Sequence, residues 1–270
     1  MNLICEKPAD FERIIEANKL SPQSSILNNL RDPINTTERY RETDDVGVIQ
    51  VLNDNGWFVD SYRQVNPHNP EMGIYKQYMA TYKNSSFPVL EGEGELTVIQ
   101  RGSKDGSRKF IFDLGFFKWS TMSGLIIGNK LFKTIEIKHI GSTPAQLGKV
   151  LGQVEEAVPQ IFNYINKLNN VILSENQKRQ LAKDAIALRY PEDKNGVSVD
   201  AVLISRHEDL SKNSLWNVLN ILNENLLKGG TFTFTSKDGK KRRSRAVKNI
   251  DLEYNISIGL WSLAEKYLNS

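Results

Sequence analysis

The sequence predicts an α+β protein: an antiparallel β meander with helices packed on it, followed by a helical half that carries a basic β-hairpin. Two observations predict this fold class. Runs with the two-residue alternation of strands gather in about residues 40–140, whereas runs with helical spacing fill most of 141–270. Such separate blocks favour α+β over a doubly wound α/β fold. We expect residues 1–35 to form an N-terminal helix and arm, and residues 36–270 to form a single α+β domain.

The composition is that of an ordinary globular protein. The chain has 270 residues, 39% hydrophobic and 25% charged, with a net charge of +3. This mild excess of positive charge says little by itself, so its distribution along the chain is the stronger signal. Cys5 is the single cysteine, which excludes an intramolecular disulfide. The sequence shows no signal-peptide pattern and no run of about 18 apolar residues, so we expect a soluble, cytoplasmic protein without a membrane partner.

The first predicted elements are a helix, an arm and a second helix. Residues 8–20 place apolar side chains at helical spacing, and residues 21–38 are rich in Ser, Asn, Pro and Thr, as in a loop or an ordered arm. A second helix is predicted to begin near Thr43 and to stop at Asn55-Gly56.

The β-rich part contains five predicted strands. They cover residues 57–65, 74–82, 95–100, 109–114 and 133–139. Asp105-Gly106 lies between the third and the fourth, and this dipeptide between two β-rich runs is a strong hairpin signal. Residues 116–131 are apolar and interrupted by glycines.

The helical half contains four predicted helical segments. They cover residues 143–169, 174–190, 201–228 and 256–269. Thr143-Pro144 and Ser174-Glu175 are typical helix starts, and Pro159 predicts a kink in the first of the four.

Residues 231–248 are the most informative stretch, because they concentrate positive charge in a short predicted hairpin. Two phenylalanines, Phe232 and Phe234, alternate in its first strand. The basic residues of the turn and the returning strand are Lys237, Lys240, Lys241, Arg242, Arg243, Arg245 and Lys248. The alternation of a strand places Lys240, Arg242 and Ser244 on one face and Lys241, Arg243 and Arg245 on the other.

We interpret this hairpin as a polyanion-binding surface. Arginine offers bidentate hydrogen bonds to phosphates. Phe232 and Phe234 would stack on bases if their rings are exposed. Arg39, Arg41, Arg108 and Lys109 are second-line candidates for the same surface. The alternative is an edge strand that its charges keep soluble, a common protection against aggregation.

Signals for catalysis are weak by comparison. The three histidines, His68, His139 and His207, show no metal-ligand spacing, and neither a nucleophile elbow nor a phosphate-binding loop is present. We therefore predict no metal and no cofactor, and we favour a binding protein over an enzyme. The enzymatic alternative would bring His139, His207, Glu208 and Asp209 together in a site acting on a nucleic acid or a nucleotide.

Several segments of the chain form a recognisable pattern, namely Glu38–Arg41, Lys138-His139, Ala187–Pro191, Arg206–Asp209, Leu215-Trp216, Asn223–Leu226, Gly229-Gly230, the basic run to Arg245 and Leu260–Glu265. Together they resemble a phage- and plasmid-encoded family catalogued as domain of unknown function 932. The resemblance covers about residues 36–268, and its C-terminal half is the more specific part. The family pattern includes a segment similar to Arg-x-x-Cys-Ser-Asn-Gly. This chain has Lys118–Gly124 at that place, without the Cys and the Asn, so no role of the family's cysteine carries over to it.

The resemblance implies a mobile-element setting in a bacterial host cell. The order of helix, meander and long helix is also similar, at the level of fold, to phage single-strand annealing proteins. We therefore expect a protein that binds single-stranded DNA, promotes annealing or recombination, and forms a homo-oligomer. A host-directed protein whose basic face meets an acidic partner stays open as a further alternative.

Overall fold

A computed structural model describes most of the chain in separate stretches. These are residues 16–20, 45–65, 77–103, 110–118, 120–121, 123–127, 135–137, 143–190, 196–210, 212–230, 232–236 and 238–268. Most of the helix predicted over 8–20 and the whole arm over 21–38 lie outside the described residues.

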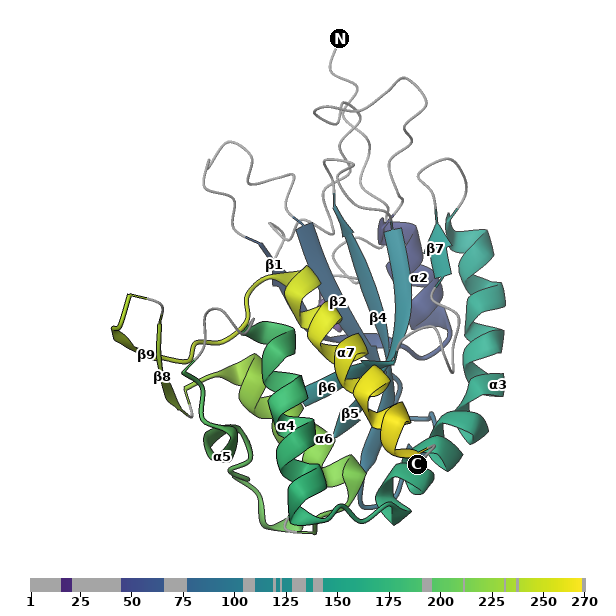
Figure 1. The fold of residues 1–270 in the computed structure, drawn as a ribbon. Helices are drawn as coiled ribbons and strands as arrows, with labels where there is room; N and C mark the ends of the chain where they lie inside the picture. Colours follow the sequence, from purple (N-terminus) through teal and green to yellow (C-terminus); the bar gives the residue numbers. More distant parts are fainter. Residues whose placement is uncertain are drawn as a thin grey trace. The chain divides into compact units, whose positions relative to one another are not determined.

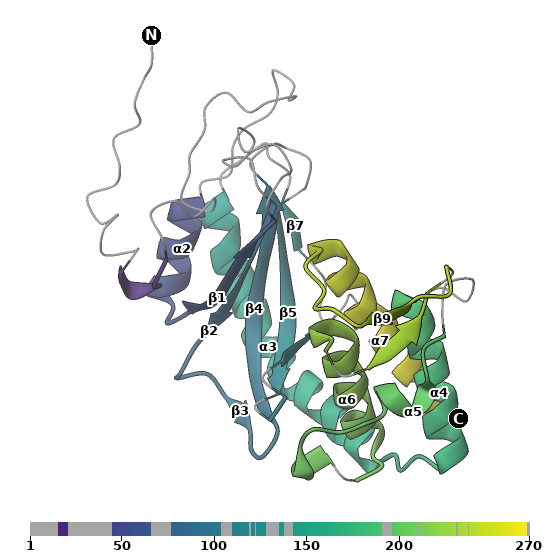
Figure 2. The ribbon, with the colours of Figure 1, turned by 90° about the vertical axis from the view of Figure 1, so that its left-hand side faces the viewer.

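Seven strands in the described part of the chain form one antiparallel sheet, which with the helices confirms the α+β class (Figure 1). The strands are β1 (Phe58–Gln64), β2 (Gln77–Lys83), β3 (Val89–Leu90), β4 (Gly94–Ser103), β5 (Phe110–Lys118), β6 (Ser123–Ile127) and β7 (Ile135–Ile137). Their order is β1-β2-β4-β5-β6, while β3 pairs with β4 and β7 pairs with β5. Figure 2 shows β1, β2 and β4 side by side. Two of these strands, β3 and β6, were not predicted from the sequence.

The helices agree with the sequence prediction except around residue 210 and at the start of α7, which begins at Ile250 rather than at the predicted residue 256. They are α2 (Asp45–Asp54), α3 (Thr143–Asn170), α4 (Glu175–Arg189), α5 (Val199–Val202), α6 (Leu215–Lys228) and α7 (Ile250–Leu268). The single helix predicted over 201–228 is wrong, because α5 ends early and only a short 3-10 turn at Glu208–Leu210 follows before α6. Ser214 caps α6 by accepting a hydrogen bond from the backbone N–H of Asn217. A side chain used in this way starts a new helix, which sequence periodicity does not register.

The chain divides into two compact units. Unit 1 comprises residues 1–88, 96–114 and 132–156, and unit 2 comprises residues 89–95, 115–131 and 157–270. No helix in the described part of the chain is long and apolar enough to cross a membrane.

Unit 1 is organised around a buried polar cluster that joins α2 to the sheet. The phenol of Tyr78 donates a hydrogen bond of 2.6 Å to the Asp45 carboxylate, and the Gln100 amide donates one of 3.0 Å to the same oxygen. Tyr82 donates to Gln100 over 2.5 Å. Burial, together with the negative charge of Asp45, raises the pKa of Tyr78 well above its ordinary value, so this phenol stays a proton donor. The first residue of α2 is thereby held to β2 and β4.

Unit 2 contains the C-terminal helices and a small separate sheet. Its helices α4, α6 and α7 pack on one another, and α6 and α7 also pack against β6. Gly259 of α7 permits a close approach to α4, because a Cβ atom there would lie 2.5 Å from the Leu188 side chain. The separate sheet is the predicted hairpin, formed by β8 (Thr233–Thr235) and β9 (Lys241–Arg243).

Replacing Tyr78 by Phe should destabilise the protein by about 1–3 kcal/mol, since it removes a donor from a buried carboxylate without changing the ring. The matched control is Tyr62→Phe, because Tyr62 is only partly buried and its hydroxyl bonds to Gln64. Urea denaturation should show a change within about 0.5 kcal/mol for the control. Equal losses in the two variants would contradict the structural role of the Tyr78–Asp45 bond.

Candidate nucleic-acid interface

Helix α6 is the centre of unit 2, because every residue except its last is buried. Polar side chains inside such a helix need partners. The Asn220 amide donates to the carbonyl of Trp216, the Asn223 amide to Gly124 at β6, and the Asn225 amide to the carbonyls of Val202 and Ile204. These amides bind neighbouring backbone and fix the segments around α6.

The N-terminal half of α6 is anchored by the carboxylate of Glu93. This carboxylate accepts hydrogen bonds from the Trp216 indole at 2.7 Å, the Lys118 ammonium at 2.7 Å and the Asn169 amide at 2.9 Å. The Lys118 side chain is only 3% exposed, so its positive charge needs a buried counter-charge. Glu93 provides it, and the carboxylate of Asp209 lies 3.6 Å away. One side chain therefore joins the β3–β4 turn, β5, α3 and α6.

The C-terminal end of α6 is surrounded by cations that bind backbone carbonyls. The Arg189 guanidinium, at the end of α4, donates to the carbonyls of Leu226 and Arg245. Arg206 donates to the carbonyl of Gly229 over 3.1 Å. Cations at this end satisfy carbonyls that the helix leaves unpaired and interact favourably with its dipole. Burial lowers the pKa of Arg189 from its ordinary value, which still leaves the side chain protonated near neutral pH.

A histidine from the segment before α6 contacts a buried carboxylate of that helix. The Nε2 atom of His207 lies 3.0 Å and 3.2 Å from the two oxygens of Glu224, and Lys228 donates to one of them over 3.2 Å. The Glu224 side chain is 5% exposed and the His207 side chain 27%. Glu224 therefore fixes the orientation of a ring that solvent can reach.

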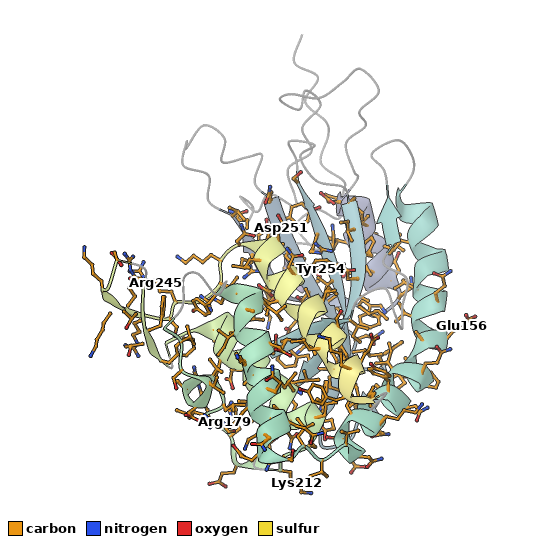
Figure 3. All side chains as sticks on the ribbon, viewed as in Figure 1. Glu156, Arg179, Lys212, Arg245, Asp251 and Tyr254 are labelled. Carbon is orange, nitrogen blue, oxygen red and sulfur yellow. The ribbon has the colours of Figure 1, made fainter. Side chains whose placement is uncertain are left out.

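Two glycines connect α6 to the hairpin. Gly229 has a φ of 64° and Gly230 a φ of 79°, values that side chains disfavour. A Cβ atom at position 229 would lie 2.3 Å from the carbonyl carbon of Arg245, so the two ends of the hairpin pass each other too closely for any other residue. Arg245 lies at the root of the hairpin, which extends away from α4 and α6 (Figures 1 and 3).

The strand register separates the hairpin into two faces, as the alternation predicted. Phe234 pairs with Arg242, whereas Thr233 pairs with Arg243 and Thr235 with Lys241. We call the face that carries Phe234, Arg242, Phe232 and Ser244 the inner face. The outer face consists of Thr233, Thr235, Lys241, Arg243 and Arg245, all of them exposed.

The aromatic residues of the inner face pack against α4. Phe232 is only 5% exposed, and its ring centroid lies 6.1 Å from that of Tyr190. Phe234 is partly buried, with its centroid 5.0 Å from the same tyrosine. The Arg189 guanidinium also lies over the Tyr190 ring, 5.0 Å from its centroid.

The charges of the hairpin are not equivalent. Asp238, in the turn, accepts a hydrogen bond of 3.0 Å from Arg242 and lies 3.9 Å from the Lys240 ammonium. Hydrogen bonds from Ser236 and Arg242 lower the pKa of Asp238, so this carboxylate stays negative. Within the described residues, no carboxylate pairs with Lys241, Arg243 or Arg245. Asp238 offsets one of the two positive charges at Lys240 and Arg242, whereas the three charges of the outer face stay unpaired among the described residues. Lys248 is also exposed.

The other predicted site residues are only partly accounted for. Lys237, Arg39, Arg41, Arg108, Lys109 and His139 lie outside the described residues. His207 contacts Glu224 rather than Glu208, while Asp209 lies near Lys118. No group of three or more His, Cys, Asp or Glu side chains in the described stretches could hold a metal ion.

Comparison with known proteins places the chain in a family. The family model described as "Domain of unknown function (DUF932)" matches residues 76–253. The chain belongs to this family. It is 24% identical over 232 residues to two proteins of Escherichia coli (strain K12), "UPF0380 protein YfjQ" and "UPF0380 protein YafZ", with 86% of this chain and 84% of each relative covered. No solved structure matches, so the fold similarity to annealing proteins stays a prediction.

Replacing Glu93 by Gln should destabilise the protein by about 3 kcal/mol, because Lys118 would lose its nearest counter-charge in a buried site. We place the value at the low end for a buried pair, since Asp209 remains 3.6 Å from Lys118. Glu91→Gln, an exposed change in the same turn, is the control. If urea denaturation shows equal stabilities for both variants, the Glu93 carboxylate does not hold unit 2 together.

Proposed function

We propose that this protein binds single-stranded DNA through the outer face of the β8–β9 hairpin and promotes the annealing of complementary strands. The observation that carries the proposal is the row of exposed, uncompensated cations at Lys241, Arg243 and Arg245. Phosphates are the anions that such a row attracts in a sequence-independent manner. The proposed setting is the cytoplasm of a bacterial cell, where a phage or plasmid would act, and the proposed active form is a homo-oligomer.

The rigid root of the hairpin supports this proposal. Arg243 itself donates two hydrogen bonds, of 3.2 and 2.9 Å, to the carbonyl of Gly230, so its guanidinium is held in place while it stays exposed. Arg189 and Arg206 hold the flanking backbone at Arg245 and Gly229. A cation that is already positioned loses less conformational entropy when it binds a phosphate. An edge strand that only needed to stay soluble would not require such fixed geometry.

The test compares two double variants that remove the same charge from opposite sides of one hairpin. Lys241→Ala with Arg243→Ala should weaken binding of a labelled single-stranded oligonucleotide by about 10-fold or more at low salt. It should also reduce the slope of log affinity against log salt by about 1.4, or about 0.7 for each lost phosphate contact. Lys240→Ala with Arg242→Ala should have a smaller effect, because Asp238 offsets one of these two positive charges.

Fluorescence anisotropy measures both quantities, and circular dichroism checks that each variant is folded. Equal losses in the two variants would show that the hairpin acts only as diffuse charge, and unchanged affinity in the Lys241/Arg243 variant would reject the assigned surface. A strand-annealing assay with complementary oligonucleotides then tests the second half of the proposal. Wild-type protein that binds but does not accelerate annealing would reject that half alone.

The contact between His207 and Glu224 favours a second function, an enzyme acting on nucleic acid. A solvent-accessible imidazole oriented by a buried carboxylate is an arrangement suited to general-base catalysis. In that case the wild-type protein should cleave a labelled single-stranded DNA or RNA, and His207→Ala should abolish the cleavage while DNA binding persists. Intact substrate after prolonged incubation with wild-type protein, with and without divalent metal, would reject this second function.

A further inference from the structure

The outer face of the hairpin is suited to an extended chain of phosphates. Lys241, Arg243 and Arg245 occupy alternate positions, so successive cations are separated by roughly 6.6 Å along the strand. The ladder continues past β9, since the N–H of Ser244 donates to the carbonyl of Phe232 over 2.9 Å. Thr233 and Thr235 add a parallel row of hydroxyl groups directly across the pair from Arg243 and Lys241.

None of the described residues of this face carries an aromatic ring. Both phenylalanines of β8 belong to the inner face, where they pack against Tyr190. Tyr190 also carries the Arg189 guanidinium over its ring. Our proposal therefore does not use Phe232, the more buried of the two, as a stacking residue. The base stacking that the sequence suggested would need an aromatic side chain, and the outer face has none. A strand lying on that face meets ammonium, guanidinium and hydroxyl groups, all of which pair with phosphate oxygens.

We propose that the hairpin binds only the sugar–phosphate backbone of a single strand. The bases do not stack on protein side chains and stay free to pair. This inference rests on the proposed function and deepens it, because it assigns the recognised chemical group. Consecutive phosphates lie along Lys241, Arg243 and Arg245, and the bases point away from the hairpin. Such a complex has no base preference, and a complementary strand can pair with the bound one without first displacing aromatic side chains.

The deciding experiment compares a thymidine oligonucleotide with an abasic oligonucleotide of the same length and charge, binding to the intact protein by anisotropy. We expect affinities within about 2-fold of each other, since the phosphates are identical. Stacking on aromatic side chains is worth about 1–3 kcal/mol per base, so loss of even one stacked base would weaken binding by about 5-fold or more. A loss of that size with the abasic strand would overturn the inference while leaving DNA binding intact.

A variant of the inner face provides an independent readout. Phe234→Leu keeps an apolar side chain against Tyr190 but removes the ring, so the affinity for the thymidine strand and its salt slope should both stay unchanged. A drop of 5-fold or more, in a variant with wild-type circular dichroism, would show that Phe234 stacks on a base. Failure of both oligonucleotides to bind wild-type protein at low salt would instead reject the proposed function itself, and with it this inference.

Discussion

The carboxylate of Glu93 is the interaction on which unit 2 depends most. It neutralises a buried lysine and accepts hydrogen bonds from the indole of Trp216 and the amide of Asn169, so four segments distant in the sequence converge on one group. The Trp216 ring also contacts Phe116 and Trp261, with centroids 5.5 and 6.0 Å away. Trp216 therefore links the apolar core to the Glu93–Lys118 ion pair, while the side-chain amides of Asn220, Asn223 and Asn225 donate to neighbouring backbone carbonyls.

The buried position of α6 determines what its far end can do. The helix ends at Gly229, where the chain turns into the hairpin, and the carbonyls at this end are bound by arginines from α4 and from the segment before α6. Burying Arg189 has a cost, seen as a lowered pKa, which two carbonyl contacts and the Tyr190 ring offset. The hairpin is consequently mounted on the most deeply buried helix of unit 2 rather than on a loose loop.

Local signals made much of this fold predictable from the sequence. The Ser174 cap and the alternation of the basic strand depend on neighbours within a few residues, and both were confirmed. The strands on either side of Asp105-Gly106 are neighbours in the sheet, although that dipeptide itself lies outside the described residues. The Glu93 cluster could not be predicted, because its partners lie 25 to 123 positions away. The prediction of one helix over 201–228 overlooked a polar stretch, because Leu210 is the only apolar residue between Ile204 and Leu215. Ser214 then begins a new helix by capping it.

The same distinction explains why the sequence suggested a stacking surface, whereas our proposal assigns a surface that binds the DNA backbone. Alternation correctly divided the cations between two faces, but it does not say which face meets the rest of the protein. Tyr190, at the end of α4, settles that choice by packing on Phe232 and Phe234, so the aromatic residues stabilise the hairpin. A protein that promotes annealing has to hold a strand without competing for its bases, because each base stacked on an aromatic ring must be released before it can pair. Under our proposal, the inward rings and the outward, uncompensated cations meet that requirement with a single strand pair.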